Sequence, residues 1–424
     1  MPTSSFKEAI LNKRMLICVF TGFSSGLPLF VLYQLVPGWL RSEGVSLAEI
    51  GLFSLIGIPY VWKFIWSPLI DRYSLGPLGR RRSWMLVTQV LLLLSIAIFG
   101  WVNPVVNIWS VAYLAAGVAF FSASQDIVLD AYRRELLPDH ELGLGNSVHV
   151  QAYRLSGLVP GSLAFILADH ISWQSVFIIV ASFMLLGILL TLFIKELDTG
   201  HDAPKSLQEA VILPFKDFIN SNGVKSAAYT LAFLVFYKLG DNMATALQTP
   251  FFIDLGFSKT EIGVIAKTSS LIAMTIGIIV GGLVMVKLSI NKALWLFGLV
   301  QIVSILGFAA LAEIGHNNYA LAITMGFEYL GVGLGAAALT AFIARTTNPA
   351  FAATQIALFT ALAVLPRTFA NATTGFIVEQ IGWTQFYFLC TALAIPGMVM
   401  LCKVAPWHEV QDKNKQTIPQ QIGT

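Results

Sequence analysis

Apolar stretches long enough to cross a lipid bilayer recur along the whole chain, separated by short polar connections. The hydrocarbon core of a bilayer is about 30 Å thick, which about 20 consecutive apolar helical residues can span. Stretches of this kind lie at residues 14–40, 47–70, 83–102, 108–132, 143–168, 173–194, 225–252, 260–286, 291–312, 319–344, 351–378 and 382–402. The pattern therefore predicts an all-α membrane protein with twelve transmembrane helices.

Composition and the placement of basic residues support this topology. The 424 residues are 56% hydrophobic and 12% charged, whereas a soluble globular protein is about 25% charged. With twelve spans, nearly all lysines and arginines outside the spans fall on one side of the membrane, and only Arg41 and Lys259 fall on the other. Cytoplasmic loops carry the Lys/Arg excess, so we expect both termini to be cytoplasmic.

The two halves of the chain contain matching segments. Gly44–Gly51 (GVSLAEIG) precedes the second span, and Gly256–Gly263 (GFSKTEIG) precedes the eighth. The loops at 168–177 and 378–387 match in the same way, and the two pairs are offset by 212 and 210 residues. Two six-helix bundles in parallel repeat are the arrangement of the major facilitator fold, with the substrate site between the halves near the membrane midplane.

The same pattern predicts the domain organisation. We expect an N-terminal six-helix bundle at residues 1–195 and a C-terminal six-helix bundle at residues 225–405. Residues 196–224 form the one long polar connection and are interpreted as a cytoplasmic linker, and residues 406–424 as a cytoplasmic tail.

The loop between the second and third spans carries a basic motif. The segment WSPLIDR ends at Arg72, and Gly79 is followed by three arginines. This resembles the signature cytoplasmic loop of the major facilitator superfamily, which latches the two halves together in one state. A basic cytoplasmic loop is also what the topology alone requires. The residues of this predicted conformational latch are Asp71, Arg72, Arg80, Arg81 and Arg82.

Several ionisable residues fall inside the predicted spans. Each costs about 2.5–3.5 kcal/mol on insertion scales, so such residues usually mark a substrate or proton path. The alternative is that they form structural ion pairs between helices. The set comprises Lys63, Asp126, Asp130, Arg154, Lys238, Asp241, Lys267, Glu328 and Arg367. Five bases against four acids predict a slightly cationic cavity, suited to a substrate that bears carboxylates.

Asp126 is the leading candidate for proton coupling. It lies seven residues from Arg133, roughly 10 Å inside the membrane, and Lys63 lies at a matched depth of roughly 12 Å. Asp130 is four residues from Asp126, on the same helix face but nearer the headgroups, where it is also suited to the cytoplasmic latch. Burial and a neighbouring lysine act in opposite directions on a carboxyl group's affinity for a proton. The proton-coupling candidates are Asp126, Asp130, Asp241 and Glu328.

The substrate-binding candidates are the remaining polar residues at depth. Lys238 and Asp241 lie three residues apart on one helix face, and Arg154 offers a planar fork for bidentate contact with a carboxylate. The full set is Lys63, Gln125, Arg154, Lys238, Asp241, Lys267 and Arg367.

Other chemistries lack support in the sequence. The six histidines show no metal-ligand spacing, and no nucleophile and base are arranged for catalysis. Gly331–Gly335 (GVGLG) imitates a dinucleotide loop, but no strand precedes it. We therefore expect a transporter rather than an enzyme, working as a monomer without cofactor, metal or nucleic acid.

At several of these segments the sequence resembles the AmpG family of muropeptide permeases. The resemblance covers both halves and includes VFTGFSSGLPL (19–29), YVWKFIWSPLIDR (60–72) and SASQDIV (122–128). It implies proton-driven uptake of N-acetylglucosaminyl-1,6-anhydro-N-acetylmuramyl peptides across the bacterial inner membrane, from periplasm to cytoplasm. It further implies a place in peptidoglycan recycling and an indirect role in β-lactamase induction. The alternative is a related major facilitator carrier of peptides or acetyl-coenzyme A.

Overall fold

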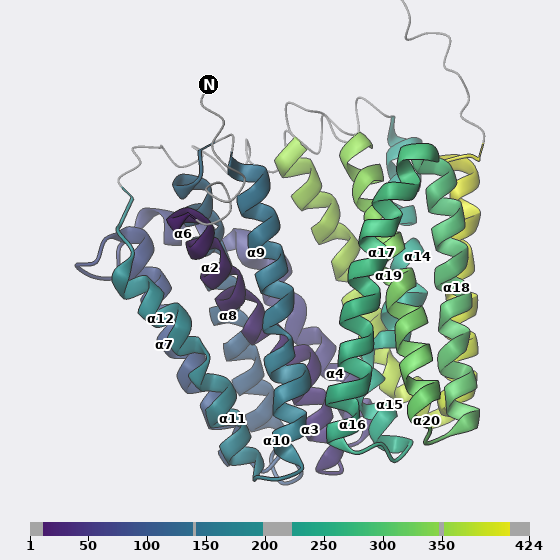
Figure 1. Ribbon diagram of the computed structural model, residues 1–424, viewed down its shortest axis with the longest axis horizontal. Coiled ribbons are helices and arrows are strands. Elements are labelled where there is room, and N and C mark those ends of the chain that lie inside the picture. Colours follow the sequence, from purple (N-terminus) through teal and green to yellow (C-terminus); the bar gives the residue numbers. More distant parts are fainter. Residues whose placement is uncertain (1–11, 139–140, 198–222, 347–351, 408–424) are drawn as a thin grey trace, which may run out of the picture.

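The computed structural model describes residues 12–138, 141–197, 223–346 and 352–407, which fold into helices packed side by side (Figure 1). The first half contains six consecutive crossings. They are formed by α2, η1 and α3 (Lys13–Phe30, Val31–Leu35, Val36–Ser42); α4, η2, α5, η3 and α6 (Leu47–Leu52, Phe53–Gly57, Ile58–Trp62, Lys63–Ile65, Ser67–Arg72); α7 and η4 (Arg80–Ile98, Phe99–Trp101); α8 (Ile108–Leu136); α9, η6 and α10 (Leu142–Ser156, Val159–Leu163, Ala164–Ala168); and α11 and α12 (Trp173–Ser182, Met184–Phe193).

The second half repeats this arrangement. Its crossings are α14 and α15 (Val224–Ala246, Gln248–Asp254); α16, η8 and α17 (Lys259–Glu261, Ile262–Ala266, Lys267–Lys287); α18 (Ile290–Ile314); α19 (Asn318–Thr346); and the two parts of α20 (Ala352–Val404). Gly382 has a φ of 77°, which interrupts α20 and divides it into two crossings. Left-handed backbone of this kind is accessible to glycine at little cost.

Twelve crossings are therefore present in the described residues, as the hydrophobic pattern predicts. Eight helices are long and apolar enough to span a membrane by length and composition alone, among them the part of α20 from Pro366 to Val404. The crossings at 47–72, 142–168 and 224–254 fall outside that set. Each of these three is divided into shorter helices, and each carries a candidate substrate residue: Lys63, Arg154 and Lys238 in turn.

The repeated segments have the same local structure in both halves. Gly44 and Gly256 both have positive φ, 88° and 85°. Each is followed by a helix whose N-terminus is closed by a reciprocal capping box, formed by Ser46 with Glu49 in the first half and by Ser258 with Glu261 in the second. Such boxes satisfy backbone N–H groups that a helix start leaves free. The sequence match therefore reflects structurally equivalent helix entries.

Both repeated entries lie at the same end of the molecule. In Figure 1 the turns near α3, α10, α15 and α16 lie at the lower end, and the start of α2 and the end of α20 at the upper end. The basic residues of the 80–82 and 133–134 segments accompany the upper end, so the positive-inside rule makes it cytoplasmic. The predicted linker and tail fall mainly within residues 198–222 and 408–424, outside the described residues, and the domain boundaries remain predictions.

Close helix packing holds each bundle together. Gly277 of α17 lies against the backbone of Leu330 and Gly333 in α19, where a Cβ atom would meet main-chain atoms. Lipid chains are as apolar as leucine, so helix association in a membrane depends on such close contact. At the periplasmic end, aromatic side chains fill both halves, including Trp39 against Phe177 and Phe251 against Tyr387.

Candidate functional site

Asp126 lies inside the N-terminal bundle with a hydrogen-bonded carboxylate. The Ser25 hydroxyl of α2 donates to its Oδ1 at 2.5 Å. Lys63, Asp130 and Arg133 are the charged groups that act on it, and the tyrosines Tyr60 and Tyr153 also face it. Lys63 forms no direct ion pair with Asp126 among the described residues. Asp126 therefore has a serine donor and several charged neighbours, and its depth and its role in proton coupling stay predictions.

Asp130 has a different environment one turn away. Its side chain is 53% exposed and accepts from Arg133 at 2.8 Å, an i,i+3 pair on α8. An exposed ion pair of this kind contributes little to stability. Asp130 is therefore an exposed, ion-paired acid, and its roles in the latch and in proton coupling stay predictions.

Gln125 of α8 lies at the contact with α2 inside the N-terminal bundle. It is fully buried, and its amide donates to the Ser24 carbonyl at 2.8 Å. Gln89 and Thr191 extend this polar cluster, with Thr191 donating to Gln89 at 2.9 Å. This position favours an interhelical role over the predicted contact with substrate.

The second half contains a compact ionisable cluster between α14, α18 and α19. The Lys238 ammonium donates to Asp241 Oδ2 at 3.1 Å and to Gln301 Oε1 at 2.7 Å. Glu328 of α19 is completely buried, and Ser304 of α18 donates to its Oε2 at 2.6 Å. The sequence predicted the Lys238–Asp241 face, and the structure adds Glu328 as its neighbour across the bundle.

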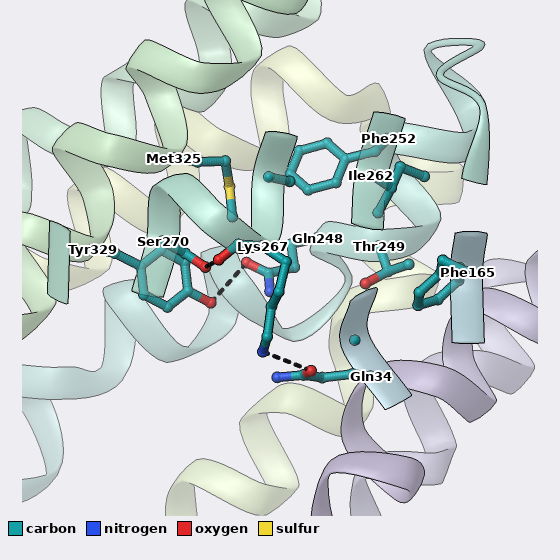
Figure 2. A pocket seen from close by; sticks show the side chains of 12 residues that line it. Gln34, Phe165, Gln248, Thr249, Phe252, Ile262, Lys267, Ser270, Met325 and Tyr329 are labelled. Carbon is teal, nitrogen blue, oxygen red and sulfur yellow. Dashed lines mark hydrogen bonds between the residues drawn. The ribbon is translucent and has the colours of Figure 1, made fainter. Parts of the chain in front are cut away.

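A polar pocket lies between the two halves (Figure 2). Lys267 of α17 donates to Gln34 Oε1 of η1 at 2.8 Å, which joins the C-terminal half to the N-terminal half. The Lys267 ammonium also lies 5.3 Å from the centre of the Phe30 ring. Within the C-terminal half, Tyr329 donates to Gln248 at 3.1 Å. The remaining lining residues are Gly161, Phe165, Thr249, Phe252, Ile262, Ala266, Ser270 and Met325.

Irregular helix turns position this pocket. Gln34 lies in η1, Gly161 in η6, and Lys267 directly follows η8; all three segments are single π-helical turns. Such turns are rare and occur frequently at functional sites. Three π-helical turns therefore border one pocket. This pocket lies between the halves, where the substrate of this fold is expected.

Two arginines remain among the predicted substrate residues. Arg154 is half-buried on α9, seven residues before the pocket residue Gly161, which is about two helical turns. Arg367 of α20 is half-buried, and its charge acts near Tyr33 and Asp241. The described residues show no ion pair for either guanidinium, so both are available to an anionic ligand.

The predicted latch loop contacts its own half. Arg81 pairs with Glu135 of α8 at 2.8 Å, and Arg82 donates to the carbonyl oxygens of Thr191 and Leu192 at the end of α12. Arg72 is exposed beside Tyr73, and Arg80 begins α7. The Asp71 side chain lies outside the described part of the structure.

Polar contacts between the halves gather at the opposite, periplasmic end. Asp169 Oδ2 accepts from the Thr260 backbone N–H at 2.7 Å and from its hydroxyl at 2.6 Å. Glu379 Oε1 accepts from the Ala48 N–H at 2.9 Å. Asp169 and Glu379 are equivalent positions in the repeat, and so are Thr260 and Ala48. We call these two equivalent contacts the periplasmic clamp.

The clamp is not evident from the sequence alone, although one sequence feature lies at the same interface. Arg41 and Lys259 are the basic residues on the periplasmic side, and both contact an acid of the other half. Arg41 pairs with Asp254 at 2.5 Å, and Lys259 lies 3.9 Å from Asp169. Exceptions to the positive-inside bias therefore mark this interface.

The two similar bundles of apolar helices, with charged residues inside them and a polar pocket between them, are the architecture of a multi-pass membrane transporter. The family model described as Major Facilitator Superfamily matches residues 15–370. The chain therefore belongs to the major facilitator superfamily. In the described residues, no group of three or more His, Cys, Asp or Glu could hold a metal ion.

Similar proteins agree with this assignment. An uncharacterized protein of Haemophilus influenzae is 46% identical over 97% of this chain and 99% of its own length. The anhydromuropeptide permease of Escherichia coli strain K12 is 39% identical over 94% of this chain and 81% of its own length. The solved structure of the nucleoside transporter NupG has a TM-score of 0.72 at 15% identity, covering 92% of this chain and 99% of that one. This last likeness shows the fold alone.

Proposed function

We propose that this protein imports anhydromuropeptides across the bacterial inner membrane, from periplasm to cytoplasm, as part of peptidoglycan recycling. The observation that carries the proposal is the 39% identity, over 94% of the chain, to a permease named for that substrate. By delivering these compounds to the cytoplasm, the protein would also support β-lactamase induction indirectly.

The chemistry of the site supports an anionic substrate. Lys267 is the cation of the interface pocket, and Arg154 and Arg367 are half-buried without an ion pair in the described residues. A peptide that carries carboxylates would supply the missing partners. An arginine can engage a carboxylate through two parallel hydrogen bonds, which also fixes its orientation.

Aromatic and amide side chains suit the sugar portion of such a molecule. Gln34, Gln248 and Tyr329 line the pocket, and Phe165 and Phe252 add apolar surface. Pockets for small molecules generally combine apolar walls with a few placed polar groups. Lys267 and Gln34 bond across the two halves, so a ligand that takes either partner would loosen that contact.

Proton coupling is assigned to Asp126. A symporter needs a group whose proton occupancy changes with the state of its surroundings, and Asp126 has a serine donor and a lysine within its electrostatic reach. Movement of Lys63 relative to Asp126 would change which protonation state is favoured. Asp130, at the rim, and the latch residues would then take part in closing the cytoplasmic side.

Binding by the purified protein tests the substrate assignment. Labelled anhydromuropeptide should bind saturably, and the same amino sugar without its peptide should compete at least tenfold more weakly, since it lacks the peptide carboxylates. Equal competition by the peptide-free sugar would contradict recognition through the cationic residues. Absence of saturable binding would contradict the proposed substrate.

A further inference from the structure

Two buried carboxyl groups inside the C-terminal bundle, neither of which lines the pocket, lack full hydrogen bonding. Asp241 Oδ1 and Glu328 Oε1 are both buried and have no hydrogen-bond donor in the described residues. The two carboxyl groups also act on each other, since Asp241 is among the groups whose charge and hydrogen bonding affect Glu328. Two carboxylates can only accept hydrogen bonds, so neither satisfies the other while both are ionised.

Buried polar atoms are nearly always paired, and an exception needs an explanation. One proton placed between Asp241 Oδ1 and Glu328 Oε1 would convert two orphaned acceptors into a donor and an acceptor. The other oxygens already have donors, because Lys238 bonds to Asp241 Oδ2 and Ser304 bonds to Glu328 Oε2. A single proton therefore completes the hydrogen bonding of this cluster.

Charge leads to the same conclusion. Lys238 is the cation in contact with the pair and compensates one carboxylate. A second buried carboxylate without a partner would cost several kcal/mol, which proteins avoid by neutralising the group. The other charged or titratable groups facing the pair are Arg367, Tyr237, Tyr329, Tyr387 and Cys390. Of these Arg367 alone is cationic, and its charge acts on Asp241.

We propose that Asp241 and Glu328 share one proton and form a second proton-binding site, in the half of the transporter opposite Asp126. The inference rests on the proposed proton-coupled import and deepens it, because each half then carries one proton. The hydroxyl of one carboxyl donates to the other, and on release the proton passes to water on the cytoplasmic side.

Lys238 supplies the link to substrate. A substrate carboxylate that draws the ammonium away from Asp241 removes the positive charge that favours ionisation of the pair. The proton is then held more firmly while substrate is bound. Once substrate leaves, Lys238 returns to Asp241 and Gln301, and the proton is released.

Glu328→Gln is the informative variant. Its amide oxygen can still accept from Ser304, and its NH2 group can donate to Asp241, so it imitates the protonated state and keeps the cluster's hydrogen bonds. Glu313→Gln is a matched control, since Glu313 bonds to Thr384 at the periplasmic end of the same bundle. Unfolding temperatures of both variants report whether the fold is intact.

The first measurement is infrared difference spectroscopy of the purified protein during a pH step, without substrate. We expect an absorption band of a protonated, buried carboxyl group that is lost in Glu328→Gln and retained in Asp126→Asn and Glu313→Gln. If every such band persists in Glu328→Gln, the pair holds no proton and the proposal is overturned. Both carboxylates would then be ionised, with Lys238 and Arg367 as their balancing charges. This readout needs no muropeptide, so its failure is distinct from failure of the proposed function.

The second measurement is the number of protons transported per substrate molecule. In proteoliposomes a substrate gradient is set against a pH gradient, and the ratio follows from the pH gradient at which net substrate transport reverses. The ratio should fall by one proton in Glu328→Gln and stay unchanged in Glu313→Gln. An unchanged ratio in a folded, transporting Glu328→Gln protein would contradict a second proton site.

Discussion

The periplasmic clamp makes a quantitative prediction about conformational balance. Asp169 accepts two hydrogen bonds from Thr260, and Glu379 accepts one from Ala48. Each bond crosses between the halves, so it exists only while the periplasmic side is closed. Loss of these bonds should therefore favour the state that is open to the periplasm.

The magnitude follows from the number of bonds. A hydrogen bond contributes about 1 kcal/mol net, and one to a charged group about 1.5–3 kcal/mol. The Asp169 side chain is 24% exposed, so solvent screening weakens its bonds and we use about 1 kcal/mol for each. Asp169→Ala removes two bonds, about 2 kcal/mol, and should shift the equilibrium about 30-fold. The double variant with Glu379→Ala removes three and should shift it about 100-fold.

Distances between spin labels on the two halves measure this shift. Suitable sites are Val106 and Tyr319, which are 80% and 84% exposed at the periplasmic ends of the two halves. Cys402 is exposed and must be replaced first, whereas Cys18 and Cys390 are buried. Asp169→Ala should raise the population of long distances, and the double variant should raise it further.

Glu43→Ala is the matched control, since Glu43 is an exposed acid at the same end with no contact to the other half in the described residues. Its distance distribution should equal that of the parent protein. If Asp169→Ala and the double variant also leave the distribution unchanged, the clamp does not hold the closed state and the reasoning is refuted.

Further predictions concern the transport pathway. Asp126→Asn should lose at least tenfold in accumulation driven by a pH gradient while keeping substrate exchange; full accumulation would move the proton site elsewhere. Arg154→Lys keeps the charge but loses the planar fork, so substrate affinity should fall about tenfold in binding assays, and wild-type affinity would exclude bidentate contact. Lys267→Gln should weaken binding of the peptide-bearing substrate more than that of the peptide-free sugar, and equal effects would contradict an anion-binding role. Gly375→Ala should favour the periplasm-open state in the spin-label assay, because a Cβ there would meet the Leu47 carbonyl, and an unchanged distribution would show that the contact yields without cost.

The sequence predicted the fold well because membrane solvation leaves few alternatives. Backbone polar groups in hydrocarbon must bond internally, so apolar length alone indicates helices, and the Gly44 and Gly256 repeats indicate two equivalent bundles. Helix irregularity was not predictable in the same way. The hydrophobic pattern does not distinguish the π-helical turns at η1, η6 and η8 from regular helix.

Contacts within one helix could be predicted from the sequence, whereas contacts between helices could not. Depth along a helix follows from residue count, so the pairing of Lys238 with Asp241 was accessible from the sequence. Which helix faces another is set by three-dimensional packing. Hence the bond from Lys267 to Gln34, the burial of Gln125 against Ser24, and the unpartnered oxygens of Asp241 and Glu328 appear only in the structure.

Transport into proteoliposomes tests the central claim most directly. Labelled anhydromuropeptide is offered outside vesicles containing the purified protein, with the external medium more acidic than the lumen. We predict accumulation above the external concentration that an uncoupler abolishes, leaving only slow equilibration. Uphill accumulation that persists with the uncoupler would contradict proton coupling, and vesicles that take up no more than protein-free ones would contradict the transport of muropeptides.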